Sequence, residues 1–399
     1  MRWRVYFEFE LDESTKDEGH PGPQWVKRLL GEDFFSRVSF VKLSHARVTD
    51  VSFLRDLPDL MTLHLYAVPI SDLACVSSMP RLETLDLYGT SVSDISRLAN
   101  LRNLKWLRLS STKVNDLTPL KNLTKIESLA AFHTHIKTLQ PLRRLVRLVD
   151  LDVSGTPISR LDGLSALRNL KDLRLGRTAV ADLKPLATIT DLSSLDCAWS
   201  KVSDVTPLAK VVGIQNLELA GTAVRDIGPL ANLKQLVTLG LSFTRVKDLR
   251  PLSGLKNLNE LTLFSTAVVD LSPLQSNARL ETLHLSGSPV KTLVSLKSVS
   301  RLFLDNTYVQ NLGPLADMKE LVALSLEGTP VSDLSPLRGL TKLYYVNIMK
   351  TKVRDLSPLR GVTSLRHITI DAGAISKDQI VRLKKALPQL SVAESSPNK

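Results

Sequence analysis

The hydrophobic positions of this chain recur with a spacing that matches neither a long helix nor a long strand. One stretch places them at Leu82, Leu85, Leu87, Val92, Ile95, Leu98 and Leu101. The two-residue step from Leu85 to Leu87 is typical of a short strand with one buried face, whereas the later three-residue steps favour a 3₁₀-like return. The pattern therefore predicts a strand followed by a tight return in every unit.

A threonine or serine marks the middle of each unit and returns every 22 residues through most of the chain. This threonine slot holds Thr90, Thr112, Thr134, Thr156, Thr178, Ser200, Thr222, Thr244, Thr266 and Ser288. It can be followed from Ala46 to Gly373, which gives about sixteen units within residues 38–375. A single unit of this size buries too little apolar surface to offset its loss of conformational entropy. The repeats are therefore expected to stack as a solenoid, each covering the apolar side of its neighbour.

The polar residues that recur with the repeat are interpreted as scaffold. The slot threonine is predicted to donate its hydroxyl to backbone groups of adjacent coils that would otherwise be buried unpaired. An aspartate four residues later, as at Asp94, is predicted to cap the turn into the 3₁₀ segment. A ladder of single carboxylates without an Asp/Asn-Gly loop is weak evidence for calcium, so neither a metal nor a cofactor is expected.

The two ends of the array have patterns of their own. Residues 1–37 combine an alternating strand pattern with an amphipathic segment and are predicted to form an N-terminal cap. Ser376 and Gln379 form a capping box that begins a predicted helix from Lys377 to Leu387. Residues 376–399 are thus predicted to be a C-terminal capping helix followed by a polar tail.

One unit is shorter than the rest, because Ser288 is followed by Thr307 after only 19 residues. The missing three-residue step lies in the return between Leu293 and Leu302. A shortened return either changes the local curvature or is absorbed by the fold.

The unit LxxLxLxxTxVxDLxPLxxL, as in Leu82 to Leu101 and Leu236 to Leu255, resembles the leucine-rich repeat superfamily, and specifically the 22-residue bacterial class typified by internalins. The resemblance covers about residues 38 to 373. It implies an α/β repeat solenoid, a curved horseshoe with a parallel sheet on the concave face, 3₁₀ or extended returns on the convex face, and a protein partner on the concave side. Internalins also carry a secretion signal and usually an immunoglobulin-like module. Neither is found here, so an extracellular adhesion role is not implied.

The net charge of the chain bears on whether it binds nucleic acid, and its cysteine content bears on where it is located. The 52 basic and 40 acidic residues give a net charge of +12, but many basic residues, such as Arg143 and Arg144, are interspersed with aspartates outside any nucleic-acid motif. A solvated surface is favoured over a nucleic-acid interface.

Cys75 and Cys197 make no disulfide framework, and no signal-like or 18-residue apolar segment is present. A cytoplasmic monomer without membrane contact is expected.

Catalytic chemistry has little support in the sequence. None of the seven histidines accompanies a nucleophile motif, and no P-loop, HExxH or GxSxG occurs. No enzyme activity is expected.

The outward strand positions are the best candidates for binding. They lie six, four and two residues before each threonine slot, with the residue directly before the slot added, because strand neighbours alternate sides. The candidate partner-binding residues are His64, Tyr66, Asp86, Tyr88, Trp106, Arg108, Phe132, His133, Asp152, Arg174, Asp196, Trp199, Phe243, Phe264, Phe303 and Tyr345. Exposed aromatics of this kind mark partner surfaces, although they can also pack on one another as a structural spine.

Acidic residues on the same face suit a basic or mixed-charge protein surface better than a phosphate backbone. The chain is therefore predicted to be a non-catalytic module that binds a protein or peptide on its concave face. The alternatives are a nucleic-acid-associated scaffold that uses the basic convex surface, and a regulatory subunit of an enzyme.

Overall fold

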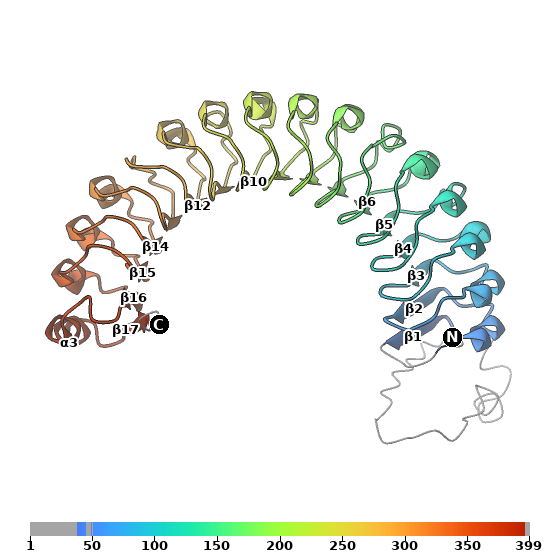
Figure 1. The fold of residues 1–399 in the computed structure, drawn as a ribbon, viewed down its shortest axis with the longest axis horizontal. Coiled ribbons are helices and arrows are strands. Elements are labelled where there is room, and N and C mark those ends of the chain that lie inside the picture. Colours follow the sequence, from blue (N-terminus) through green and yellow to red (C-terminus); the bar gives the residue numbers. More distant parts are fainter. Residues whose placement is uncertain (1–37, 45–48, 50, 396–399) are drawn as a thin grey trace, which may run out of the picture. The chain divides into compact units, whose positions relative to one another are not determined.

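The computed structural model describes residues 38–44, 49 and 51–395 of the 399-residue chain. The predicted N-terminal cap, residues 1–37, lies outside the described residues. The chain divides into two compact units, Met1–Lys201 and Val202–Lys399. Each unit is a stack of coils that carries its strands on the concave side and its 3₁₀ helices on the convex side (Figure 1).

The first unit contains eight described strands that pair in parallel, each with the next along the chain. They are β1 (Phe40–Ser44), β2 (Thr62–Tyr66), β3 (Thr84–Asp86), β4 (Trp106–Arg108), β5 (Ser128–Ala130), β6 (Asp150–Asp152), β7 (Asp172–Arg174) and β8 (Ser194–Asp196). The 3₁₀ helices are η1 (Ser52–Asp56), η2 (Ala74–Ser78), η3 (Ser96–Asn100), η4 (Thr118–Leu120), η5 (Gln140–Arg144) and η6 (Lys184–Thr188).

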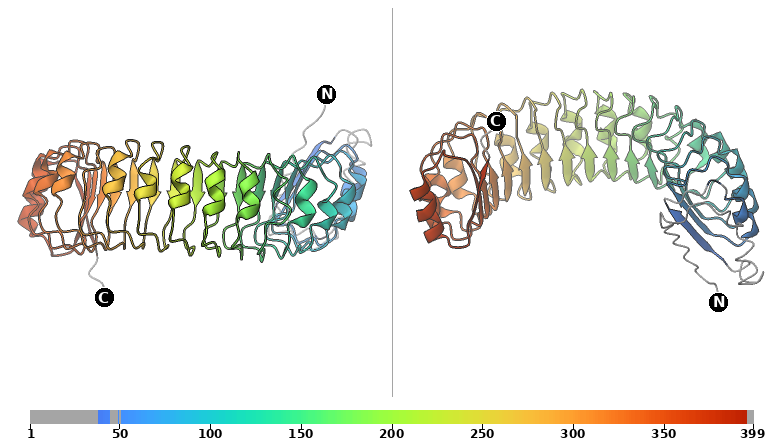
Figure 2. Two further views of the ribbon diagram at one scale, coloured as in Figure 1. Left: turned by 90° about the horizontal axis from the view of Figure 1, so that it is seen from above. Right: turned by 60° about the horizontal axis from the view of Figure 1, so that its bottom comes forward.

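The second unit continues the same alternation and ends in an α-helix and a last strand (Figure 2). Its strands are β9 (Asn216–Glu218), β10 (Thr238–Gly240), β11 (Glu260–Thr262), β12 (Thr282–His284), β13 (Arg301–Phe303), β14 (Ala323–Ser325), β15 (Tyr345–Asn347), β16 (His367–Asp371) and β17 (Ser391–Ser395). Its helices are η7 (Thr206–Lys210), η8 (Gly228–Asn232), η9 (Arg250–Leu252), η10 (Ser272–Ser276), η11 (Gly313–Asp317), η12 (Ser335–Gly339), η13 (Ser357–Gly361) and α3 (Lys377–Ala386).

The repeat spacing places one ladder of side chains inside each unit. In β3 the central Leu85 is fully buried, while Thr84 and Asp86 on either side of it are half-buried and outward. Register is preserved from coil to coil, so that Leu85 pairs with Leu107 in the next strand. The predicted curved solenoid with a parallel sheet and 3₁₀ returns is confirmed, and its stability comes from neighbour-to-neighbour packing.

The slot threonines are buried, but they bond within their own coil rather than to adjacent coils. Thr90 donates its hydroxyl to the carbonyl of Leu87 at 2.8 Å, and Thr178 donates to that of Leu175 at 2.7 Å. The prediction of bonds between coils was wrong, because the turn after each strand brings the carbonyl three residues earlier directly against the hydroxyl.

The aspartate and proline of each unit shape the entry into the 3₁₀ helix, as predicted. Asp116 accepts a hydrogen bond from the backbone N–H of Thr118, the first residue of η4, at 2.8 Å. Pro119 follows at the next position, where its fixed φ suits the first helical turn. The same aspartate bond recurs at η3, η6 and η7.

From Ala67 to Lys350, the residue directly before the threonine slot adopts a left-handed backbone. Glycine fills this position at Gly89 and Gly155, with φ of 68° and 66°, but Trp199 and Phe243 adopt it at 59° and 57°. The sequence interpretation treated this position simply as one more outward residue. The glycines at this slot were the signal for a positive φ that the interpretation missed.

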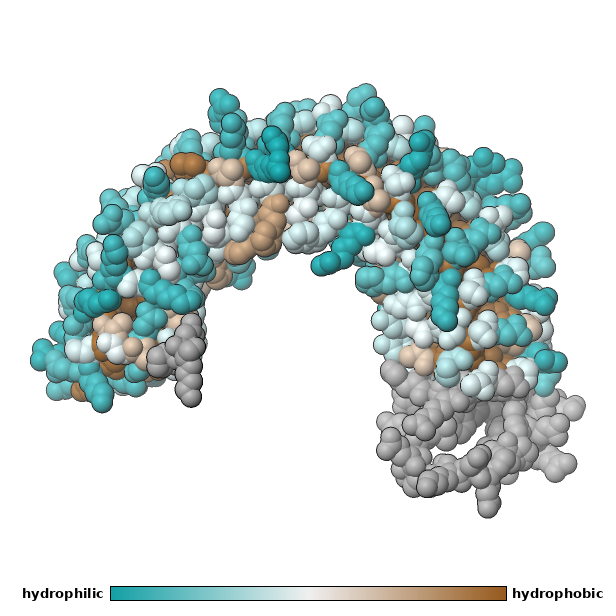
Figure 3. Space-filling model, in the orientation of Figure 1, coloured by the Kyte–Doolittle hydropathy of each residue, from teal (hydrophilic) through white to brown (hydrophobic). Residues whose placement is uncertain are grey.

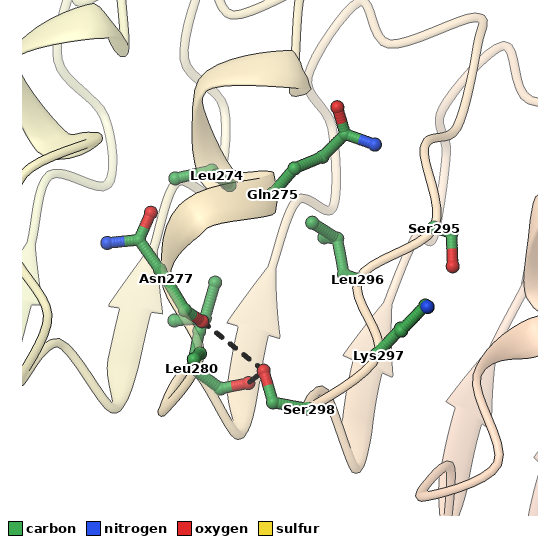
Figure 4. Close-up of a pocket in the computed structure, with 9 residues that line it drawn as sticks. Leu274, Gln275, Asn277, Leu280, Ser295, Leu296, Lys297 and Ser298 are labelled. Carbon is green, nitrogen blue, oxygen red and sulfur yellow. Dashed lines mark hydrogen bonds between the residues drawn. The ribbon is translucent and has the colours of Figure 1, made fainter.

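The short unit between β12 and β13 keeps its strand register, with Thr282 opposite Arg301, and its return contains no 3₁₀ helix. The fold therefore accommodates the missing step on the convex side. A pocket of about 390 Å³ lies there between η10 and residues 295–298, lined by Leu274, Leu280 and Leu296 among others (Figure 4).

The C-terminal end is closed by α3 and β17. The Ser376 side chain accepts a hydrogen bond from the backbone N–H of Gln379, whereas the Gln379 amide reaches the previous coil and bonds the Leu356 N–H and the Arg354 carbonyl. The predicted return bond of the capping box is thus replaced by a bond to the array. Residues Ser391–Ser395 form a strand beside β16 rather than the start of a polar tail.

Candidate interaction surface

The outward positions of the strands form the candidate surface in each unit. A strand such as β4 buries its central leucine in the coil and turns Trp106 and Arg108 the other way. The Trp106 side chain is 54% exposed, which is more than any other candidate aromatic. In the view of Figure 3 hydrophilic side chains dominate the outer rim of each unit.

An aromatic run crosses the coils of β2 to β5 in the first unit. The rings of Tyr66 and Tyr88 are stacked with centroids 4.9 Å apart, and those of Tyr88 and Phe132 are tilted at 5.9 Å. Phe132 meets His133 edge-on at 5.6 Å. These four residues are therefore brought together and pack on one another, as the spine interpretation expected, whereas Trp106 remains largely exposed.

Arg108 covers this run. Its guanidinium lies 4.3 Å from the centroid of the Tyr88 ring and 5.8 Å from that of Phe132. It also pairs with Asp86 at 3.6 Å. Both distances are within the range of a cation–π contact.

His64 lies near the start of the run, with its ring 5.6 Å from that of Phe40. Burial lowers the pKa of His64, although the charge of Asp86 opposes the shift. Its imidazole is therefore neutral at neutral pH.

Acidic side chains gather on β6, β7 and β8, directly after the aromatic run. Arg174 pairs with Asp172 at 2.8 Å and with Asp150 at 3.5 Å. Burial raises the pKa of Asp172 and of Asp196, and neighbouring carboxylates, Asp152 among them, add to the shift. We call Asp150, Asp152, Asp172 and Asp196 the acidic cluster. Arg174 is the one arginine that pairs with this cluster, so the cluster keeps a net negative charge.

Trp199 lies three residues after β8, in the same coil, and is 49% exposed. The guanidinium of Arg177 is 6.0 Å from its ring centroid. Within the first unit, Trp106 and Phe132 thus lie in the coils before the acidic cluster, and Trp199 lies in its last coil.

The remaining candidates lie in the second unit and form separate pairs. Phe243 and Phe264 meet edge-on at 4.8 Å, and His284 stacks on Phe303 at 4.2 Å with nearly parallel rings. Tyr345 lies half-buried on β15. Phe243 is 48% exposed. These residues give the second unit an aromatic strand face of its own.

The sequence interpretation missed a polar network on β13 to β15. Asp305 accepts hydrogen bonds from Ser286, Ser325 and the backbone of Glu327. Glu327 in turn pairs with Lys350 at 2.8 Å. Asp305 and Glu327 both precede their threonine slots by two residues, which was the available signal.

The described residues contain neither a metal-binding cluster nor a helix that could span a membrane. No group of three or more histidine, cysteine or carboxylate side chains there is arranged to hold a metal ion. Cys75 and Cys197 are buried thiols with no disulfide bond between them, and burial raises the pKa of Cys197. None of the helices in residues 38–44, 49 and 51–395 has the length and apolar character needed to cross a bilayer.

Several solved structures share the fold. The internalin InlF from Listeria monocytogenes is 25% identical, with a TM-score of 0.70 and coverage of 73% of this chain and 88% of that chain. A leucine-rich repeat protein from Leptospira interrogans is 18% identical, with a TM-score of 0.68 and coverage of 91% and 86%. Comparison with protein-family models and with curated protein sequences gives no match.

A third structure is the leucine-rich repeat ectodomain of the receptor kinase GASSHO1/SCHENGEN3 from Arabidopsis thaliana, in complex with CASPARIAN STRIP INTEGRITY FACTOR 2. It is 14% identical, with a TM-score of 0.69 and coverage of 91% of this chain and 48% of that chain. The fold and its strand face define a leucine-rich repeat protein. Among such proteins the repeat and the bacterial structures make this chain internalin-like.

Proposed function

We propose that the chain is a non-catalytic module that holds a protein or peptide partner on the strand face, chiefly that of the first unit. A large exposed aromatic side chain contributes little to folding and much to a protein interface once a partner covers it. Trp106, on β4 beside the aromatic run, has this character.

The main support for the proposal is the left-handed backbone conformation of Trp199 and Phe243. Both adopt the left-handed conformation, which costs roughly 1–2 kcal/mol for a residue with a side chain and nothing for glycine. Several other coils have glycine at this position, and others have a small or polar residue such as Ser111 or Asn306. Large aromatics that are about half exposed therefore occupy a strained position that local stability does not favour, and a binding role accounts for them.

The electrostatics of the face favour a polypeptide over a nucleic acid. The acidic cluster would repel a phosphate backbone, whereas it attracts a lysine or arginine of a protein partner. The GASSHO1/SCHENGEN3 ectodomain, which shares this fold, is itself in complex with another factor, and this supports the proposal. A partner that is itself an enzyme would make the chain a regulatory subunit with the same binding mode.

Affinity capture from a native lysate tests the proposal. The chain is used as bait at two salt concentrations, with and without nuclease, and retained proteins are identified by mass spectrometry. We expect a polypeptide that is retained after nuclease treatment and at both salt concentrations. Recovery that depends on intact nucleic acid and falls steeply with salt would instead support the convex-face scaffold.

A further inference from the structure

The loops that lead from each 3₁₀ helix to the next strand lie side by side from coil to coil (Figure 2). At one position of these loops, side chains 22 residues apart contact each other across neighbouring coils. The contacts are the ion pairs Arg81–Asp59 at 2.9 Å and Lys342–Glu320 at 2.6 Å, and the hydrogen bond Lys125–Asn103 at 2.7 Å. This loop position therefore brings long side chains of adjacent coils together and accommodates a carboxylate beside a cation.

The first unit has cations on adjacent coils in this region. Arg147 follows Lys125 at the same loop position, where other coils pair a cation with a carboxylate. Asn169 of the next coil donates a hydrogen bond to the Val146 carbonyl at 2.8 Å, which places the neighbouring Arg168 beside the loop of Arg147. Among the described residues the side chains of Arg147 and Arg168 make neither a hydrogen bond nor an ion pair. Like charges on adjacent coils repel one another, so local stability does not favour them.

The loops around these cations contain little negative charge of their own. In residues 123–127, 145–149 and 167–171 the one carboxylate is Glu127, which is half-buried. The stretch ends at Asp191, which has the loop position of Arg147 two coils later. We call three exposed side chains of these loops the basic edge, namely Lys125, Arg147 and Arg168. The basic edge is thus a short positive surface with acidic residues at its limits.

Two exposed valines lie within the basic edge. Val146 is 49% exposed and Val149 is 39% exposed, whereas the preceding coil has Thr124 and Glu127 at these positions. Exposed apolar side chains beside cations suit a partner that supplies both apolar side chains and carboxylates. A single-stranded nucleic acid stacks its bases on aromatic side chains, and these three loops contain none. The surroundings of the basic edge therefore favour a polypeptide over a nucleic acid.

We propose that the basic edge docks an acidic, partly apolar segment of a protein partner, at a site separate from the strand face. Carboxylates of the partner take the place that Asp59 has beside Arg81. The loops of Lys125 and Arg168 are two coils apart, which is roughly 10 Å at the usual strand separation, and an extended segment covers this distance with about three residues. The segment is expected to carry two acidic residues about three positions apart, with an apolar residue between them that contacts Val146.

Selection from a random linear peptide library on phage tests this proposal. Phage that bind the wild-type chain are depleted on the double variant Arg147→Gln with Arg168→Gln, so that sequences which require the basic edge remain. The control depletion uses Arg338→Gln with Arg360→Gln, a matched loss of two exposed arginines on η12 and η13. We expect the acidic–apolar–acidic pattern after the first depletion and its removal by the control depletion.

A synthetic peptide of the selected sequence is then measured by fluorescence anisotropy. We expect the double glutamine variant to raise its Kd about fivefold or more without lowering the melting temperature. Arg147→Glu should also weaken binding, and it should not lower the melting temperature, because the new carboxylate can pair with Lys125 as Asp59 does with Arg81. A single-stranded oligonucleotide and phosphatidylserine vesicles, measured at the same ionic strength, should bind more weakly than the peptide.

Three results would overturn the inference. They are selected peptides without acidic residues, no enrichment of any peptide that requires Arg147 and Arg168, and equal peptide affinity of the wild type and the double glutamine variant. Tighter binding of the oligonucleotide or the vesicles through the same arginines would overturn it as well and assign the basic edge to nucleic acid or lipid. Trp106→Ala should leave the affinity for this peptide unchanged, so failure here is distinct from failure of the strand face.

Discussion

The hydroxyl of a slot threonine accounts for one buried hydrogen bond in each coil. Thr178→Val keeps the shape of the side chain and removes the donor to the Leu175 carbonyl, which lies 2.7 Å away. We expect a loss of about 1–3 kcal/mol in the free energy of unfolding, measured by chemical denaturation. Thr178→Ser retains the hydroxyl and is the control. Equal stability of the valine and serine variants would show that the slot is filled for packing alone.

The left-handed position before the slot allows a second comparison between matched residues. A Cβ on Gly155 would lie 2.4 Å from Nδ1 of His133, whereas a Cβ on Gly89 would meet nothing closer than 3.6 Å. Both glycines have positive φ, so Gly89→Ala should cost about 1 kcal/mol from the backbone alone. Gly155→Ala should cost more and should displace the His133 ring, which NMR of the imidazole would report. Equal losses in melting temperature with an unmoved His133 would contradict this account.

The acidic cluster predicts a trade-off between stability and binding. The pKa of Asp172 is raised in the folded chain, chiefly by burial, so the folded state disfavours its ionised form. This unfavourable contribution is present above the folded pKa and disappears as the pH falls below the unfolded value near 3.8. Asp172→Asn should therefore not lower the melting temperature at neutral pH. It should also lower the affinity for a basic partner. Because the pKa of Asp172 is raised, wild-type affinity should begin to fall at a higher pH than it would with an aspartate of ordinary pKa.

Some of these residue-level features follow from the sequence and others do not. The aspartate cap could be predicted because Asp116 bonds a backbone N–H only two residues away, which is a local preference. The partner of the slot threonine could not, because carbonyls of its own coil and of the next coil are both plausible from spacing. The packing of Arg108 on Tyr88 also depends on side-chain conformation, which repeat spacing does not determine.

At the scale of elements, α3 closes the second unit through a single glutamine. Gln379 bonds the Leu356 N–H at 2.9 Å and the Arg354 carbonyl at 2.8 Å. Gln379→Ala should expose these backbone groups and increase hydrogen exchange at residues 354–356. The exposed Arg382, which pairs with Asp378 on the same helix, is the control, and Arg382→Ala should leave exchange at those amides unchanged. Identical exchange in both variants would mean that the helix closes the array by apolar packing alone.

The elements themselves were largely predictable. The alternation around Leu85 requires a strand, and the three-residue steps from Val92 to Leu101 require a tight return. The strand β17 was not foreseen, because Ser391–Ser395 has a polar outward face and its pairing with β16 is a tertiary contact. The short return before β13 was located correctly, although the pocket beside η10 follows from how neighbouring coils fill the space.

At the scale of the whole molecule, the side chains that stabilise the coils lie on a different side from those proposed to bind a partner. The inward leucines pack coil against coil, so they determine the solenoid and leave the outward positions free to vary. The outward aromatics and charges can therefore serve recognition without a large effect on folding. This separation means that binding and stability should respond independently to outward substitutions.

The most direct test of the central claim compares the affinities of two variants for the captured partner. Trp106→Ala removes the most exposed candidate aromatic, and the double reversal Arg143→Glu with Arg144→Glu alters the convex η5. The account predicts that Trp106→Ala weakens binding by about 2 kcal/mol or more, roughly thirtyfold in Kd, with little change in melting temperature. The convex variant should bind almost as wild type. A convex variant that binds less tightly than Trp106→Ala, with affinity that falls steeply as salt is added, would contradict it.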